Sequence, residues 1–143
     1  MKSVKKNNVQ VKGTGTRAML FAHGFGCDQS AWRLVTPAFE ADHRVIVFDN
    51  VGAGGSELSA YSRGKYSTLN GYADDLLDIC RELELREVVF VGHSVSAMIG
   101  VLAAIKDPDR FDRLVLVAPS PRYIHDTDYV SGFTRTDIEG LLD

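Results

Sequence analysis

The chain has 143 residues, of which 45% are apolar and 24% charged, and its formal net charge at pH 7 is −3. These values fit one globular domain and give no reason to expect a protein that binds nucleic acid. The longest apolar runs have only strand length and residues 1–10 are polar, so we expect a cytoplasmic protein with no membrane span and no signal peptide.

Strand and helix patterns alternate along the chain. In chain order they are an edge strand at 8–12, a buried strand at 18–22, a helix at 28–41, a buried strand at 44–49, a helix at 69–83, a buried strand at 88–91, a helix at 96–106 and a buried strand at 114–118. The first helix is predicted from the spacing of Trp32, Val35 and Phe39, and the second is predicted to turn its acids outward. This alternation predicts an α/β fold, a parallel (doubly wound) sheet with helices on both faces.

Two glycine-rich loops follow the first two buried strands, at the edge where such sheets place their chemistry. His23-Gly24-Phe25-Gly26 can aim amide N–H groups into a cleft, as an oxyanion hole requires, or can be a simple connecting loop. Residues 49–56 do not fit a nucleotide motif, because Glu57 stands where G-x-G-x-x-G needs glycine and no Gly-Lys-Ser/Thr follows. A nucleotide-binding domain is therefore the weakest hypothesis.

The third buried strand ends in G-H-S-V-S at residues 92–96, close to the nucleophile-elbow pattern G-x-S-x-G. In that pattern the serine occupies a strained strand-to-helix turn, and small residues on either side let strand and helix pass closely. The leading glycine meets this need, and Ser96 adds only a hydroxymethyl group. Ser94 is thus the candidate nucleophile, with the amides of Phe25 and Val95 as oxyanion donors. The alternative is an ordinary serine at a helix N-terminus.

The remaining polar candidates are predicted to be structural. His93 must point away from the neighbouring hydroxyl, His43 is expected on the surface at the opposite end of the sheet, and Asp49 is expected to brace its loop by hydrogen bonds. Cys27 and Cys80 lack CxxC spacing and are predicted to be packing residues, so the sequence indicates no metal and no cofactor.

Four longer stretches read HGFGCDQSAW, YSTLNGYADDLLDI, VFVGHSVSAMIGVLA and SPRYIHDTDYVSGF. Together they resemble the α/β-hydrolase superfamily and, within it, the group that contains the plant karrikin and strigolactone receptors and the bacterial stress-pathway regulator RsbQ. The resemblance covers essentially the whole chain, and the plant karrikin receptors also have G-H-S-V-S. It implies slow hydrolysis of small apolar esters or lactones, which some members use to signal to a protein partner.

The resemblance also implies an apolar pocket under a helical cap. Phe25, Tyr123 and Phe133 match its lining aromatics, although Tyr123 and Phe133 could simply be packing residues of a loop. Because family members are about twice as long, we expect only the N-terminal half of the fold. Residues 1–130 would be the N-terminal part of the core, and residues 131–143 would begin a truncated cap, with a helix announced by the capping box Thr136–Glu139.

The histidine and acid of a serine triad should follow the nucleophile in the chain, and the resemblance places both in the missing half. His125 lies at the correct end of the sheet but matches a loop position. The strand at 114–118 would be an uncovered apolar edge, which favours pairing with another chain. We therefore predict a homo-oligomer, or completion by a C-terminal half, through this strand.

Two functions of different classes follow. The first is a serine hydrolase of small esters or lactones, inactive or very weak in this chain alone because loss of the base removes most of the rate. The second is a non-catalytic module that binds a small ligand or a signalling protein.

Overall fold

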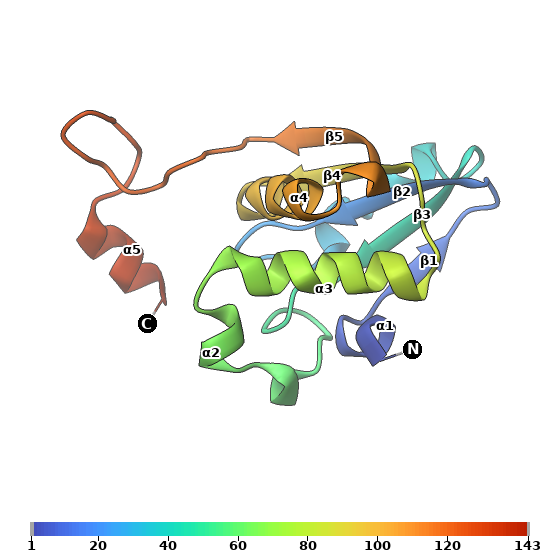
Figure 1. Cartoon of the computed structure of the whole chain (residues 1–143), viewed down its shortest axis with the longest axis horizontal. Helices are drawn as coiled ribbons and strands as arrows, with labels where there is room; N and C mark the ends of the chain where they lie inside the picture. Colours follow the sequence, from blue (N-terminus) through green and yellow to red (C-terminus); the bar gives the residue numbers. More distant parts are fainter. Residues whose placement is uncertain (1, 143) are drawn as a thin grey trace.

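The strands form one five-stranded sheet with the order β1-β3-β2-β4-β5 in the computed structural model, which describes residues 2–142 (Figure 1). They are β1 (Gln10–Lys12), β2 (Arg17–Ala22), β3 (His43–Phe48), β4 (Val88–His93) and β5 (Phe111–Val117). Each neighbouring pair is parallel except β1 and β3. The predicted α/β fold is confirmed. The division at residues 130 and 131 stays a prediction, and its outer ends, Met1 and Asp143, lie outside the described residues.

Helices of two kinds connect these strands. The α-helices are α1 (Lys2–Lys6), α2 (Arg63–Tyr66), α3 (Leu69–Glu82), α4 (Val95–Lys106) and α5 (Arg135–Leu142), and the 3-10 helices are η1 (Gln29–Trp32), η2 (Thr36–Ala38), η3 (Leu58–Ala60) and η4 (Pro108–Arg110). The two long helices match their predicted spans closely. Helix α4 ends directly before Asp107, as expected for a residue that precedes proline.

Helices α3 and α4 cover one face of the sheet, where they lie side by side (Figure 1). Leu20, Ile46 and Phe90 from the strands pack there with Leu76 and Ile99 from the helices, and all five side chains are fully buried. Each such side chain contributes about 1.5–3 kcal/mol on leaving water. This core fixes the positions from which the loops at the carboxyl edge of the sheet depart.

The opposite face is covered by residues 28–41. The sequence predicted one helix there, and that prediction is wrong. The segment forms the short helices η1 and η2 instead. Pro37 explains the break, because its ring removes an N–H group and clashes with the carbonyl one turn earlier. Trp32 and Phe39 still pack on the sheet, with ring centroids 5.2 and 6.0 Å from that of Phe21. Val35, the third residue of the predicted stripe, is exposed, so the predicted spacing holds only for the two aromatic residues.

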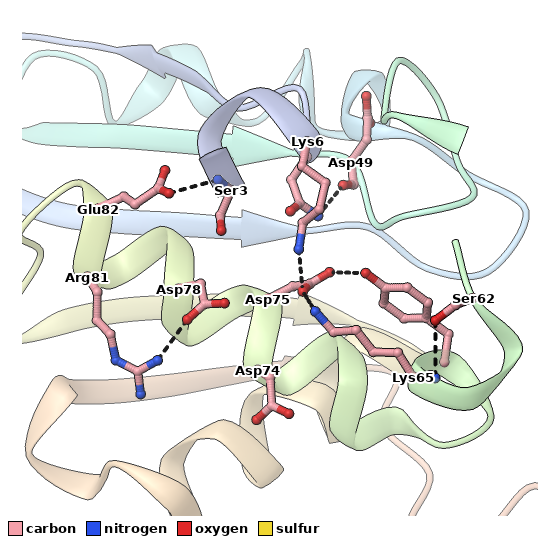
Figure 2. A network of polar contacts seen from close by, with 12 residues as sticks. Ser3, Lys6, Asp49, Ser62, Lys65, Asp74, Asp75, Asp78, Arg81 and Glu82 are labelled. Carbon is pink, nitrogen blue, oxygen red and sulfur yellow. Dashed lines mark hydrogen bonds and ion pairs between the residues drawn. The ribbon is translucent and has the colours of Figure 1, made fainter. Parts of the chain in front are cut away.

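The acids of α3 do not all face outward, which corrects a second prediction. Asp75 is 1% exposed, and its Oδ1 lies 2.5 Å from the Nζ atoms of both Lys6 and Lys65. The Tyr66 hydroxyl donates to Oδ2 over 2.9 Å. This cluster fastens α1 and α2 to α3 (Figure 2).

Helix α1 was not predicted, because its sequence has no apolar stripe. Long-range contacts hold it: the Glu82 carboxylate accepts hydrogen bonds from the amides of Ser3 and Val4 over 2.8 and 2.9 Å (Figure 2). These partners lie almost eighty residues apart in the chain, and no local pattern signals them.

Strand β5 lies at the edge of the sheet, with Val115 and Val117 43% and 40% exposed. Its pairing with another chain stays a prediction. Helix α5 forms near the predicted place, but Thr134 rather than Thr136 caps it. The Thr134 amide donates to the Asp137 carboxylate over 2.7 Å, and the Asp137 amide donates back to the Thr134 hydroxyl over 3.2 Å. Over residues 2–142, no helix has the length and apolar character to cross a bilayer.

Candidate active site

The loops that follow β2, β3 and β4 meet at one edge of the sheet, because these neighbouring strands run parallel. The glycine-rich loop follows β2, the loop at 49–56 follows β3, and the G-H-S-V-S turn joins β4 to α4. The order of strands therefore brings together three segments that are distant in sequence.

The turn at Ser94 has the strained geometry expected of a nucleophile elbow. Ser94 has φ 55° and ψ −121°, a conformation that a residue with a side chain rarely adopts. A Cβ atom at Gly92 would lie 2.6 Å from Phe90 Cε1 and 2.7 Å from the Ser96 carbonyl oxygen, so only glycine fits. The Ser94 amide donates to the Val117 carbonyl over 2.9 Å and anchors the turn to β5.

Ser96 fills the position where the elbow pattern has its second glycine. Its hydroxyl donates to the His23 carbonyl oxygen over 2.5 Å and accepts from the Asn50 side-chain amide at 3.2 Å. Ser96 is fully buried, and its bond to the His23 carbonyl is shielded from water, whereas the bond from Asn50 is partly buried. The hydroxymethyl group thus joins the elbow to the loops after β2 and β3, a role that the sequence pattern did not reveal.

His23 is buried and has both ring nitrogens occupied. The backbone amide of Asn50 donates to Nε2 over 3.0 Å. The Nδ1 atom therefore carries the proton and donates to the Gly24 carbonyl oxygen at 2.8 Å. A neutral imidazole held in this way braces the loop and has no free nitrogen to take a proton from Ser94.

Asp49 braces the loops, as predicted. Its carboxylate accepts from the Asn8 side chain at 2.8 Å, from the backbone and side chain of Gln29 at 2.8 and 2.9 Å, and from the Gly55 amide at 2.9 Å. Burial alone would raise the pKa of this carboxyl, but the hydrogen bonds from Asn8, Gln29 and Gly55 outweigh it and hold the pKa below its ordinary value. Through Gln29, this carboxylate fixes the end of the glycine-rich loop.

The glycine-rich loop lies directly against the elbow. A Cβ atom at Gly24 would come within 2.6 Å of His93 Nδ1 and 3.3 Å of Ser94 Cβ. The next amide in the loop belongs to Phe25, and the first amide of α4 belongs to Val95. Neither amide donates to an acceptor within residues 2–142, so both N–H groups are available to a ligand.

A cavity of about 770 Å³ opens beside the elbow. Its lining includes all five residues singled out from the sequence, namely Phe25, Ser94, Val95, Tyr123 and Phe133. The Ser94 and Tyr123 hydroxyl oxygens are 3.4 Å apart, and Ile138 and Leu141 of α5 add apolar surface. The roles of these residues in catalysis and binding stay predictions.

The other titratable side chains are placed differently. His125 is exposed and is not part of the cavity lining. His43 is half-buried rather than on the surface, with its ring 6.0 Å from that of Phe39. Cys27 is exposed, so its predicted packing role is wrong, whereas burial raises the pKa of the Cys80 thiol to about 12. Among the residues that the structure describes, no three His, Cys, Asp or Glu side chains are grouped to hold a metal ion.

Comparison with known proteins gives a consistent assignment. The chain is 45% identical over 137 residues to the karrikin insensitive 2 receptor CA of Petunia hybrida, and 47% identical over 135 residues to the strigolactone esterase D14 of Arabidopsis thaliana. These matches cover 96% and 94% of this chain and 51% of each relative, so the chain spans about half their length. A solved hydrolase from Oleispira antarctica matches with a TM-score of 0.90 and 44% identity, over 96% of this chain and 51% of that one.

A family model described as alpha/beta hydrolase fold matches residues 17–143. This range contains the parallel strands, the glycine-rich loop and the elbow. The chain belongs to the alpha/beta hydrolase fold family.

Proposed function

We propose that this chain carries the nucleophile and the oxyanion donors of a serine hydrolase for small esters or lactones. The observation that carries the proposal is the strained backbone of Ser94, held at the edge of a cavity and touching the glycine-rich loop. Strain of this kind persists where the surrounding structure enforces it, and it is concentrated at functional sites.

In the proposed reaction, Ser94 Oγ forms a bond to the carbonyl carbon of the substrate. The π electrons move to the carbonyl oxygen, and the N–H groups of Phe25 and Val95 stabilise the resulting oxyanion. The intermediate then collapses, expels the alkoxide and leaves an acyl group on Ser94. The proton of the serine hydroxyl passes to a base, which is a histidine in a complete triad.

The apolar lining supports esters or lactones with a hydrocarbon body as substrates. The relatives agree with this class, since one is named a strigolactone esterase and another a karrikin receptor. Within the described residues no imidazole lines the cavity. We therefore expect slow acylation by the chain alone, because oxyanion donors and binding retain about 10³–10⁴-fold catalysis in serine hydrolases without a working triad.

The experiment is acylation of the chain by p-nitrophenyl butyrate, followed by intact-mass measurement and peptide mapping. One butyryl group on Ser94 is expected, with none at that peptide in Ser94→Ala. Ser67→Ala is the matched control, because Ser67 lines the same cavity without the strained turn, and its labelling should equal that of the unchanged chain. Equal labelling of the unchanged chain and Ser94→Ala would overturn the proposal.

A second candidate is ligand binding without turnover, in a signalling role like that of RsbQ. It is favoured by the absence of a histidine from the cavity lining over residues 2–142 and by the naming of several relatives as receptors. This candidate would be favoured over the first if the chain without substitutions binds an apolar ester but shows no acyl group on Ser94. Action in the cytoplasm stays a prediction under both candidates.

A further inference from the structure

Among the described residues, the charged side chains that line the cavity are all of one sign. Two arginines, Arg122 and Arg135, contribute to its lining, and no acid or lysine does so within the described chain. A cleft of low polarity with charges of one sign attracts ligands of the opposite sign.

The charge of Arg122 is already balanced. Its guanidinium forms an ion pair with the Asp126 carboxylate, four residues further along the same loop segment. The pair is about half-exposed, and the Asp126 carboxylate balances the charge of Arg122. Arg122 alone therefore gives no preference for an anion.

Arg135 is different, because no acidic side chain of residues 2–141 lies within ion-pair distance of it. The acid nearest in sequence, Asp137, is turned back onto the amide and hydroxyl of Thr134, both at 2.7 Å. Arg135 is the first residue of α5, and the Asp137 carboxylate in the first turn balances the partial positive charge of that helix end. The Arg135 guanidinium is therefore a positive charge beside the apolar cavity that no acidic side chain of residues 2–141 pairs with.

We infer that this cavity takes a ligand with an apolar body and a carboxylate group, which Arg135 binds. The inference deepens the proposed function, since it names the substrate class as esters or lactones that carry a carboxylate away from the reacting carbonyl. Phe25 and Phe133 contact the apolar body, and the planar guanidinium can donate hydrogen bonds to both carboxylate oxygens at once.

The binding test uses the Ser94→Ala chain, so that it does not depend on turnover. 4-Phenylbutyrate and the neutral 4-phenylbutanol are titrated in turn and followed by NMR. The carboxylate should bind about fivefold tighter than the alcohol, as expected for an exposed ion pair, and high salt should reduce the difference. Arg135→Gln should remove the preference and Arg135→Lys should retain part of it. Arg86→Gln, at the opposite edge of the sheet, should leave it unchanged.

Equal affinities for the two probes, or a preference that survives Arg135→Gln, would overturn the inference. A second measurement separates it from the proposed function: Ser94 acylation by p-nitrophenyl butyrate and by the p-nitrophenyl hemiester of succinic acid. Acylation by both esters at the same rate contradicts the inference and leaves the nucleophile standing. A carboxylate preference in binding without any acylation of Ser94 supports the ligand class and contradicts the hydrolase.

Discussion

Two aspartates, Asp49 and Asp75, are equally buried at 1% exposure, but their charges are satisfied in opposite ways. Asp49 accepts four hydrogen bonds from the neutral donors of Asn8, Gln29 and Gly55, whereas Asp75 is held by two lysines and a tyrosine on helices. The first arrangement keeps a negative charge beside the candidate site and aligns backbone. The second neutralises the carboxylate and fastens α1 and α2 to α3.

Loss of the two carboxylates should therefore lower the free energy of unfolding by different amounts. At Asp49, the donors left behind are neutral, and some can turn to water. At Asp75, the lysine left behind is a charge: the Lys6 side chain is only 11% exposed. An uncompensated buried charge is among the most costly defects in a protein interior.

Asp75→Asn is expected to have the largest effect. It should lower the free energy of unfolding by about 3–5 kcal/mol, because Lys6 keeps its charge and loses its partner, while Lys65 can turn toward solvent. Urea unfolding followed by circular dichroism measures this. The double variant Lys6→Met with Asp75→Leu should recover most of the loss, and a double variant as unstable as Asp75→Asn would contradict the explanation.

Asp49→Asn should cost less, about 1–3 kcal/mol, because an amide offers one acceptor oxygen where the carboxylate offered two. The pKa of Asp49 is lowered in the folded chain, so its contribution is present above the unfolded pKa of about 4 and is lost as the pH falls through the folded pKa. The stability difference between the unchanged chain and Asp49→Asn should therefore shrink below pH 4. A constant difference down to pH 2 would count against the hydrogen-bond network as its source.

Tyr66→Phe should have the smallest effect, about 1 kcal/mol, and should appear at the other end of the pH range. Burial, then the hydrogen bond to Asp75, raises the pKa of Tyr66 to about 12. The neutral phenol therefore stabilises the fold fully below its unfolded pKa of about 10, and the contribution is lost as the pH rises toward 12. The difference in urea midpoint between the unchanged chain and Tyr66→Phe should be smaller at pH 11.5 than at pH 9. A difference that widens with pH would refute this assignment.

Much of the fold could be predicted from sequence because its strands are continuous apolar runs and its two long helices carry regular spacing. The elbow could be found for a related reason, because the constraints on it act between near neighbours in the chain. Gly92 leaves no room for a Cβ atom, and Ser94 has a positive φ angle. Local patterns failed at Asp75 because the deciding contact is distant: its burial depends on Lys6, which lies 69 residues earlier. The 3-10 turns at 29–38 were missed for another reason, since Pro37 is a local signal that the prediction gave less weight than the apolar spacing.

The five residues named from the sequence line the cavity, but the two arginines that line it with them were not foreseen. Phe25, Tyr123 and Phe133 could be named because aromatic residues stood at matching motif positions. Arg135 could not, because it lines the cavity only when the chain returns through the bridge between Ile124 and Phe133 to place α5 beside the elbow.

The buried hydroxyl of Ser96 has an evolutionary consequence. A chain with glycine at position 96 would satisfy the steric rule of the elbow. It would leave the side-chain amide of Asn50 and the carbonyl of His23 without their present partner. Positions 50 and 96 are therefore coupled, and a chain with only one of the two residues exchanged should be less stable than a chain with both or neither exchanged. Descendants of this chain should keep the asparagine and serine together or lose them together.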